Sequence, residues 1–354
     1  MKVYYYHTQD LNRIAREWHE GTFPGHFLYG ATHLPQQGID VVMHRHKPLT
    51  GRFRLAWYVM RQVLGCKEKF DAIYCSQFGG MELIIILHAI GLYRKPIIAW
   101  QHPPIQKHRS RLRNTLSKLF YRGFDHLFMF SDKLITESVA TGKVKADKVC
   151  LGHWGPDLVF YDHLMKGFDL SSRRGFISTG KEKRDFPTLI QAFSETGQPI
   201  SILLNHTNGS INYDRIIGEL GTPMENVHIE FLTELCPGEI AQRVNQSQCV
   251  AICCMDTNYT VGLTTLVEAY ALALPVITSR NSAFPIDVEE EGIGIAVDYG
   301  DTQGWKDAIN YMSTHPEEAR RMGIRARLLA EQRFNLDILS KEVADKIKEI
   351  VEHR

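Results

Sequence analysis

Short apolar runs that read as buried β-strands alternate with helical patterns along almost the whole chain. The runs cover residues 3–6, 39–43, 72–75, 96–100, 126–130, 175–179, 200–204, 227–231, 249–254 and 276–278. Strands that alternate with helices in this way form parallel sheets that are covered by helices on both faces. The sequence therefore predicts an α/β fold.

The two series of strands are separated by an irregular polar stretch near residues 161–174. A chain of 354 residues exceeds the size at which a single hydrophobic core stops growing. We therefore expect two Rossmann-like domains whose parallel sheets face a central cleft. Ligands bind beyond the carboxyl ends of strands in such sheets, and clefts between domains are preferred sites. Residues 336–353 read as a final amphipathic helix.

Net charge, the apolar runs and the cysteines limit which classes of protein this chain can belong to. The formal net charge is +1, so bulk charge does not indicate a nucleic-acid partner. The opening MKVYYYHTQDL lacks the apolar core of a signal peptide, and the longest apolar run, 83–87, is too short to span a bilayer. We expect a cytoplasmic protein. Cys249, Cys253 and Cys254 are expected to be small buried hydrophobes, and no paired metal-ligand motif supports a metal site.

Residues 260–280 form the most informative motif. A predicted helix opens there with four residues whose backbone N–H groups are free to bind an anion: Gly262, Leu263, Thr264 and Thr265. Glu268 lies one turn further along, where its carboxylate can accept hydrogen bonds from sugar hydroxyls. One helix would then hold a sugar phosphate at two points. The alternative is an ordinary helix start followed by a solvated glutamate.

A second motif follows the predicted strand 175–179. It comprises Gly180, Lys181, Lys183 and Arg184, with Pro187 at the start of the next helix. Three cations at the carboxyl end of a strand are suited to neutralise a diphosphate leaving group. Arginine would contribute bidentate hydrogen bonds and lysine a point charge. The alternative is a solvated charged loop.

The first half of the chain offers weaker candidates. His102 follows the predicted strand 96–100, and the two prolines after it keep it out of a helix. It can serve in proton transfer or bind a sugar hydroxyl, although a single histidine is more often structural. Gly25 and His26 lie in a glycine-containing loop, 21–27, that we place between the first strand and the first helix. The loop is not a G-x-G-x-x-G fingerprint, which disfavours a nicotinamide dinucleotide.

Residues 106–124 contain six cations and no acid, interleaved with leucine and phenylalanine. This pattern is typical of a basic amphipathic helix at a membrane interface. At about 1 kcal/mol for each cation near an anionic leaflet, the segment could support reversible attachment. The alternative is a surface helix whose apolar side faces its own core.

These motifs together resemble those of GT-B-fold glycosyltransferases, in particular the retaining family numbered four. The stretch GLTTLVEAYALALPVITS at 262–279 is similar to the family's donor-binding motif, and GKEKRDFPTLI at 180–190 to its phosphate-binding loop. GPDLVF at 155–160 resembles the turn that closes the first domain, and His102 stands at the place of a family histidine. The segments are spread over nearly the whole chain.

The resemblance implies roles for the candidate residues. Glu268 would bind the ribose of a nucleoside-diphosphate sugar, and Thr264 and Thr265 its phosphates. Lys181 and Arg184 would offset the charge of the leaving group, with Lys183 in a lesser role. The base would lie near Leu232 and Thr233.

The resemblance also implies how the domains divide the work. Residues 1–160 with the returning segment 336–354 would form the acceptor-side domain, with Gly25, His26 and His102 near the acceptor. Residues 170–335 would form the donor-binding domain. The expected reaction is a metal-independent transfer, without a cofactor, of a sugar to a glycan or lipid-linked hydroxyl.

One position departs from the family pattern. The motif often has two glutamates with seven residues between them, and Thr260 stands where the first is expected. Threonine cannot supply a negative charge near the donor sugar, so the stereochemical outcome stays open. Two alternatives therefore accompany the main interpretation: a nucleotide-sugar epimerase of the same fold, and a nucleotide-sugar binding protein without catalytic activity.

Overall fold

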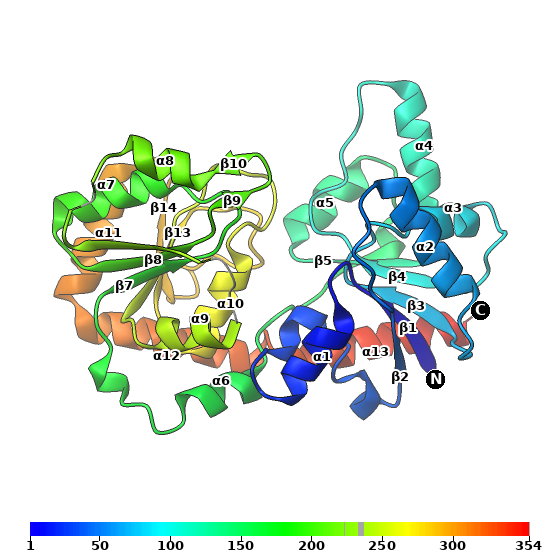
Figure 1. The fold of residues 1–354 in the computed structure, drawn as a ribbon, viewed down its shortest axis with the longest axis horizontal. Helices are drawn as coiled ribbons and strands as arrows, with labels where there is room; N and C mark the ends of the chain where they lie inside the picture. The colour runs from blue at the N-terminus through cyan, green and yellow to red at the C-terminus, as the bar shows by residue number, and fades with distance from the viewer. Residues whose placement is uncertain (223, 233–236, 354) are drawn as a thin grey trace. The chain divides into compact units, whose positions relative to one another are not determined.

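The computed structural model describes residues 1–222, 224–232 and 237–353. Its contacts divide the chain into two compact units, each built on a six-stranded parallel sheet. The first unit contains Met1–Gly21, Gly25–Trp154 and the C-terminal segment from Asn335 onward. The second contains Thr22–Pro24 and Gly155–Phe334. The predicted α/β class with two parallel sheets is confirmed (Figure 1).

The first sheet has the strand order β2-β1-β3-β4-β5-β6. Its strands are β1 (Lys2–Tyr6), β2 (Asp40–Met43), β3 (Ala72–Cys75), β4 (Ile97–Trp100), β5 (His126–Met129) and β6 (Val149–Leu151). The helices of this unit are α1 (Leu11–His19), α2 (Arg52–Leu64), α3 (Glu82–Ala89), α4 (Arg111–Arg122), α5 (Asp132–Ala140) and α13 (Leu336–Glu352). Short 3₁₀ turns add η1 (Gly25–Leu28), η2 (Leu34–Gln37) and η3 (Ala146–Lys148).

The second sheet has the order β11-β8-β7-β12-β13-β14. Its strands are β7 (Phe176–Thr179), β8 (Ile200–Leu204), β11 (Val227–Phe231), β12 (Cys249–Ile252), β13 (Val276–Ser279) and β14 (Gly294–Val297). A small antiparallel hairpin pairs β9 (Thr207–Asn208) with β10 (Ile211–Asn212). The helices are α6 (Leu158–Met165), α7 (Phe186–Thr196), α8 (Tyr213–Glu219), α9 (Pro237–Asn245), α10 (Leu263–Ala271), α11 (Thr302–Thr314) and α12 (Pro316–Gln332), with the turn η4 (Leu170–Ser172).

Each unit buries a core between its sheet and its helices. In the first unit the indole N–H of Trp100 donates to the Tyr74 hydroxyl at 2.8 Å, so a large buried ring keeps its polar atom satisfied. In the second unit Phe176, Phe193 and Trp305 lie in one apolar cluster beneath α7 and α11. Helix α13 packs against η2, and Glu342 on it contacts the ring of His153 at 2.5 Å.

The structure corrects several expectations. Helix α6 occupies part of the stretch that we read as irregular, and it begins where the Asp157 carboxylate accepts the Phe160 N–H. The glycine-containing loop 21–27 follows α1 and does not lie between the first strand and the first helix. Strands β6 and β14 were missed because β6 has only three residues and β14 begins with a glycine, which weakens a strand signal.

Two further expectations can be compared with the structure. Cys249, Cys253 and Cys254 are buried as free cysteines, as predicted from their apolar surroundings. Within the described ranges, no helix combines the length and the apolar character that crossing a bilayer requires.

The close pairing of β13 and β14 provides a test of the fold. A methyl group added at Gly294 would overlap the backbone carbonyl of Val276, whereas one added at Gly218 in α8 would meet no atom within 4 Å. We expect Gly294→Ala to lower the free energy of unfolding by about 2–3 kcal/mol, since a backbone atom cannot yield easily. Gly218→Ala should be neutral or slightly stabilising, because alanine favours helix.

Urea denaturation followed by circular dichroism measures both variants. Equal stability of the two would contradict the described packing of β14 against β13.

Candidate functional site

Three segments of the second unit meet at the side chain of Arg184. The arginine follows β7 and forms an isolated antiparallel bridge with Cys254, which follows β12. Its Nε donates to the Thr179 carbonyl at 3.1 Å and its Nη1 to the Cys254 sulfur at 2.9 Å. Its Nη2 donates to the Thr265 hydroxyl on α10 at 2.9 Å. Arg184 is only 3% exposed, so one buried side chain ties the strand ends to the start of α10.

Two glycines make room for this guanidinium. Gly180 has φ +103° and Gly262 has φ +96°, values that L side chains rarely adopt. A methyl group at Gly180 would overlap the Arg184 guanidinium, and one at Gly262 would lie 2.7 Å from Ile252 Cγ2. We predicted that these glycines allow a ligand to approach the backbone. In the structure their lack of a side chain also lets the Arg184 guanidinium lie close to the backbone.

The N-terminus of α10 has no side-chain cap. Gly262 is its N-cap residue in the left-handed conformation, and no side chain accepts a hydrogen bond from the first turn. Four other helices of the same unit are capped by side chains, those of Asp157, Asp185, Asn212 and Asp301. The first turn of a helix has N–H groups without intrahelical partners, which bind anions readily. The first turn of α10 therefore has backbone N–H groups that no side chain caps, as does that of α12 in the same unit.

The residues of this first turn differ in their accessibility. Leu263 is 3% exposed and Thr265 is 4% exposed, so both side chains face the interior. Thr264 is exposed, and its hydroxyl lies next to the uncapped backbone. A ligand at this turn would meet backbone N–H groups and the Thr264 side chain.

Helix α10 has an arginine at each end, half-buried Arg173 and buried Arg184. Near its C-terminus, Arg173 donates to the carbonyls of Leu272 at 2.7 Å and Ala273 at 3.4 Å, where the negative end of the helix dipole favours a cation. At the N-terminus, Arg184 faces the positive end of the same dipole. No described carboxylate forms an ion pair with Arg184. Within the described residues its charge therefore has no direct ion-pair partner.

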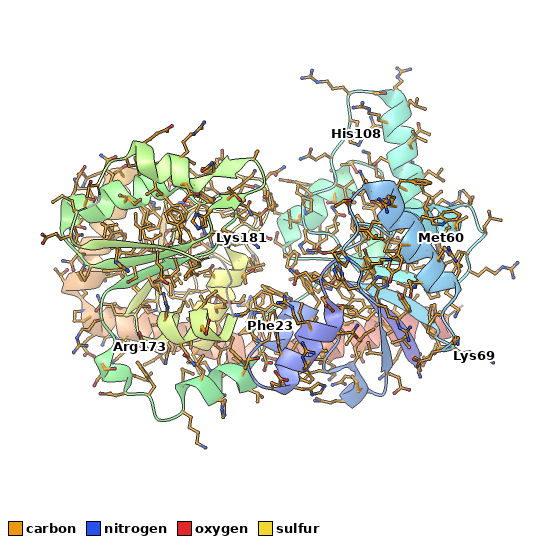
Figure 2. All side chains as sticks on the ribbon, in the orientation of Figure 1. Phe23, Met60, Lys69, His108, Arg173 and Lys181 are labelled. Atoms are coloured by element: carbon orange, nitrogen blue, oxygen red, sulfur yellow. The ribbon has the colours of Figure 1, made fainter. Side chains whose placement is uncertain are left out.

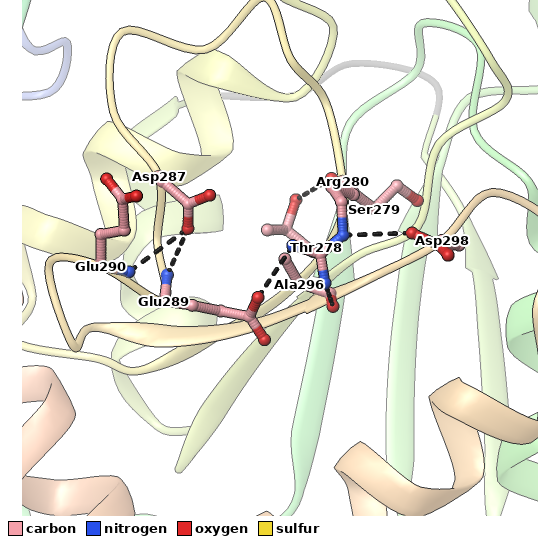
Figure 3. A network of polar contacts seen from close by, with 8 residues as sticks. All are labelled: Thr278, Ser279, Arg280, Asp287, Glu289, Glu290, Ala296 and Asp298. Carbon is pink, nitrogen blue, oxygen red and sulfur yellow. Dashed lines mark hydrogen bonds and ion pairs between the residues drawn. The ribbon is translucent and has the colours of Figure 1, made fainter.

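Arg280, after β13, shows the contrasting arrangement in the same unit. Its guanidinium donates to Glu289 at 2.8 Å, to Asp298 at 3.1 Å and to the Ala296 carbonyl at 2.8 Å (Figure 3). The Asp287 carboxylate accepts the backbone N–H of Glu289 in the same network. Arg280 is neutralised by direct ion pairs, whereas Arg184 has none with the described carboxylates.

Glu268 is the carboxyl group whose titration responds to Arg184. Burial raises the pKa of Glu268 to about 7, although the neighbouring Tyr161 hydroxyl and the Arg184 charge lower it. Tyr161 is fully buried on α6, which packs against α10. Because Glu268 is partly protonated near neutral pH, it neutralises Arg184 only in part. The side chain is half-buried and one turn along the helix from Thr264, as the sequence predicts.

The two lysines of the Gly180 loop differ in their surroundings. Lys181 is exposed and forms no ion pair in the described part of the chain, so its ammonium is available to a ligand (Figure 2). Its backbone carbonyl accepts the Tyr213 hydroxyl at 2.8 Å. Lys183 adopts φ +44°, and its ammonium lies 5.3 Å from the centre of the Tyr259 ring. The fixed backbone and the free ammonium make Lys181 the more accessible cation.

The predicted base-binding loop follows β11. The backbone N–H of Leu232 donates to the Leu204 carbonyl at 2.8 Å, and its carbonyl accepts from Asn205 at 3.3 Å. Thr233 lies outside the described residues. The roles of both residues stay predictions.

The candidates of the first unit lie at the carboxyl edge of its sheet and in η1. His102 follows β4, and its Nε2 lies 2.9 Å from the carbonyl of Ser76, the residue after β3. Gly25 and His26 are buried in η1, and the His26 carbonyl accepts the indole N–H of Trp154 at 3.0 Å. Contact of His26 with an acceptor would require η1 to move. The acceptor-side roles of these residues stay predictions.

Sequence reasoning missed three residues of the site. Tyr213 holds the Gly180 loop, Cys254 accepts from Arg184, and Tyr161 approaches Glu268. Burial was predicted for Cys254, but nothing in the sequence pairs any of the three with its partner. Within the described ranges, no three His, Cys, Asp or Glu side chains are grouped so as to hold a metal ion.

The chain was compared with known proteins. No protein-family model matches it, and no curated protein matches it either. Solved structures do match the chain. Anabaena HepE in complex with UDP-glucose is 16% identical with a TM-score of 0.68, over 99% of this chain and 100% of that one. Sucrose-phosphate synthase from Thermosynechococcus elongatus is 14% identical with a TM-score of 0.70, over 100% and 99%. A Rickettsia africae glycosyltransferase is 12% identical with a TM-score of 0.67, over 100% and 99%.

These similarities establish the architecture. At such low identity they show the fold alone. That fold is the GT-B fold predicted from the sequence, with two α/β units that each contain a parallel sheet. Membership of the retaining family numbered four is not established by them.

The raised pKa of Glu268 gives a pH-dependent test. A carboxyl whose pKa is about 7 when folded and 4.5 when unfolded binds its proton more tightly in the folded state. Its contribution to stability is present below pH 4.5 and is lost as the pH rises to about 7. We therefore expect Glu268→Gln to be nearly neutral at pH 5 and to stabilise the fold by about 1–2 kcal/mol at pH 8, after allowance for solvent screening.

Urea denaturation at the two pH values measures this difference. Glu225→Gln, which removes an exposed carboxylate of the same unit, is the control and should show no pH-dependent gain. Loss of stability in Glu268→Gln at pH 8 would show that the folded protein stabilises the charged form.

Proposed function

We propose that this protein is a glycosyltransferase that transfers a sugar from a nucleoside-diphosphate sugar to a hydroxyl group of a glycan or lipid-linked acceptor. The observation that carries the proposal is Arg184, which has no direct ion pair with a described carboxylate, next to the uncapped N-terminus of α10. A diphosphate is the anion that suits two such features side by side. The fold adds support, since HepE was crystallised with UDP and with UDP-glucose.

The proposed chemistry follows from the charges of the site. As the bond between sugar and diphosphate breaks, negative charge develops on the leaving group. Lys181, Arg184 and the N–H groups of α10 would offset this charge, so a metal ion is not required for it. Preorganised groups are effective because the protein has already oriented them before the reaction. Thr264 would contact the phosphates, and Gly180 and Gly262 would let them approach the backbone.

Glu268 would bind the ribose hydroxyls of the donor. An ionised carboxylate accepts two hydroxyl hydrogen bonds more strongly than a protonated one. Because burial raises the pKa of Glu268 to about 7, donor affinity should increase as the pH rises through neutrality. Lys183 and Leu232 would line the donor at a greater distance from the reacting bond.

We propose retention of configuration, by resemblance to the retaining family, and biosynthesis of a polysaccharide or glycoconjugate as the setting. Thr260 is half-buried, and its carbonyl accepts the Leu263 N–H, so the position of the missing glutamate instead shapes the turn before α10. His102 would act near the acceptor hydroxyl. The anomeric configuration of the product, measured by nuclear magnetic resonance, tests retention.

We also propose a cytoplasmic protein that associates peripherally with anionic membranes through residues 106–124. Leu112 and Leu116 on α4 are 68% and 56% exposed, so part of the apolar side of the helix is not covered by its own core. The cations beside them favour an anionic lipid surface.

Donor binding and turnover test the site. Lys181→Ala should lower kcat/KM for the accepted donor by about tenfold or more, because it removes a point charge from the developing diphosphate. Lys166→Ala, an exposed lysine of the same unit without an ion pair, is the matched control and should leave kcat/KM unchanged. The donor is first found by thermal shift against uridine, guanosine and adenosine diphosphates, since a ligand of the native state raises apparent stability.

The same assay separates the alternatives. A transferase releases nucleoside diphosphate in proportion to acceptor, whereas an epimerase converts the donor with no acceptor present. The other alternative is a binding protein without catalytic activity, which is motivated by the threonine at position 260 where a glutamate is expected. Such a protein would bind the donor and form no product. Equal activity of Lys181→Ala and Lys166→Ala would refute the assignment of the phosphate site.

A further inference from the structure

A cavity of about 570 Å³ lies within the first unit, between α4 and the segment that leads into β6. Thr115, Lys118, Leu119 and Arg122 line it from one face of α4, at the spacing of successive helical turns. Lys143 and Val144 line the opposite side. None of the elements that form the cavity belongs to the candidate donor site.

The lining of this cavity is cationic. Five of its residues are lysine or arginine, and none is aspartate or glutamate: Lys118, Arg122, Lys143, Lys145 and Lys148. None of the five forms an ion pair with a described carboxylate. These five cations therefore have no ion-pair partner among the described residues.

Two of these lysines are held in place from the cavity wall. Lys143 is 6% exposed, and its ammonium donates to the Gln106 carbonyl. The Lys148 ammonium donates to the Phe124 carbonyl at 2.8 Å. An ammonium has three N–H donors, so each retains donors beyond the one engaged. A buried ammonium that is hydrogen-bonded only to a neutral carbonyl is costly unless a ligand supplies negative charge. A phosphate group provides both the charge and several acceptor oxygens.

The cavity also has an apolar component, from Leu119 and Val144 together with the ring of Tyr121. A free inorganic anion gains nothing from such a wall, whereas a phosphate carried on a hydrocarbon chain buries apolar surface there. The lining therefore fits an amphiphilic anion.

The surface around the cavity indicates where such an anion comes from. Large exposed apolar side chains occur on α2, α3 and α4 and in the segment that follows α3, and α3 packs against both other helices (Figure 1). They are Phe53, Trp57, Leu64, Ile86, Ile90, Leu92, Leu112 and Leu116, and in the described part of the first unit only Met1 is a further example. Phe53 is 72% exposed and Trp57 is 50% exposed. Soluble monomers rarely leave so many large apolar side chains together.

Cations accompany these apolar side chains. Arg54 on α2, and Arg111 and Arg113 on α4, are exposed and without ion pairs in the described structure. Aromatic and aliphatic side chains mixed with arginine are the composition that partitions into the headgroup region of an anionic bilayer.

We propose that the cavity beneath α4 binds the phosphate group of an anionic membrane lipid while α2, α3 and α4 present their outer surface to the bilayer. The proposal deepens and rests on the peripheral membrane association of the proposed function, and it is independent of sugar transfer. Lys118 and Arg122 would contact the phosphate from α4, and Lys143 would contact it from the opposite wall of the cavity. Leu119 and Val144 would contact the first part of the lipid chain.

Flotation of the full chain with vesicles tests the proposal. Phosphatidylcholine vesicles containing phosphatidic acid present an exposed phosphate monoester, and vesicles with phosphatidylglycerol are matched to them in surface charge. The wild type should bind the phosphatidic acid vesicles more tightly. Lys118→Glu/Arg122→Glu should remove this preference, with a loss of affinity of about tenfold or more for phosphatidic acid vesicles.

A matched variant distinguishes binding of a phosphate in the cavity from general electrostatic attraction to an anionic membrane. Arg111→Glu/Arg113→Glu reverses two exposed charges of the same helix outside the cavity, so it should weaken binding to both vesicles equally and keep the preference. Equal effects of the two variants would overturn the cavity assignment while leaving peripheral association in place. Absence of binding to either vesicle by the wild type would overturn both.

Two further measurements complete the test. Soluble glycerol 3-phosphate carries the same phosphate without a chain, and equally tight saturable binding of it would overturn the membrane lipid as the ligand. Thermal shift with the nucleoside diphosphate should be the same in the wild type and in Lys118→Glu/Arg122→Glu. That result shows that the variant is folded and that the donor site is tested separately.

Discussion

The hydrogen bonds of the Arg184 guanidinium are the interaction on which the second unit's candidate site depends. One buried side chain joins the end of β7, the segment after β12 and the first turn of α10. Its position explains why residue 180 is a glycine, since a side chain there would displace it, whereas a side chain at Gly262 would first meet Ile252. It also explains the polarity of the site, because no described carboxylate pairs with it at the positive end of a helix dipole.

Helix α10 shows how the direction of a helix determines what its ends can bind. Arg173 meets carbonyl oxygens at the C-terminal end, where a cation is stabilised by the protein alone. The N-terminal end lacks a capping side chain and adjoins a buried cation instead. In the proposed function, an anion bound here would meet groups that the fold has already placed. Part of the cost of ordering the site would then be met before the ligand arrives.

Much of the architecture could be predicted from the sequence because it depends on local pattern. The ten apolar runs became strands, and Asp185 with Pro187 set the start of α7. Failures occurred where the local signal was weak or ambiguous. β14 begins with a glycine, β6 has three residues, and α6 lies in a polar stretch. In each case packing against neighbouring elements supplied the stability that the sequence pattern did not indicate.

The sequence by itself determined the α/β class and the two sheets, because these follow from the periodicity of apolar residues. Short motifs placed Lys181 in a loop after a strand, and Thr264 and Glu268 on a helix that follows a strand. Only the tertiary structure decided which charges are neutralised. Arg280 and Arg184 both follow strands of the same sheet, yet one meets Glu289 and Asp298 and the other meets Thr265 and Cys254. The partners of Arg184 are far apart from it in the chain, so long-range packing rather than local pattern brings them together.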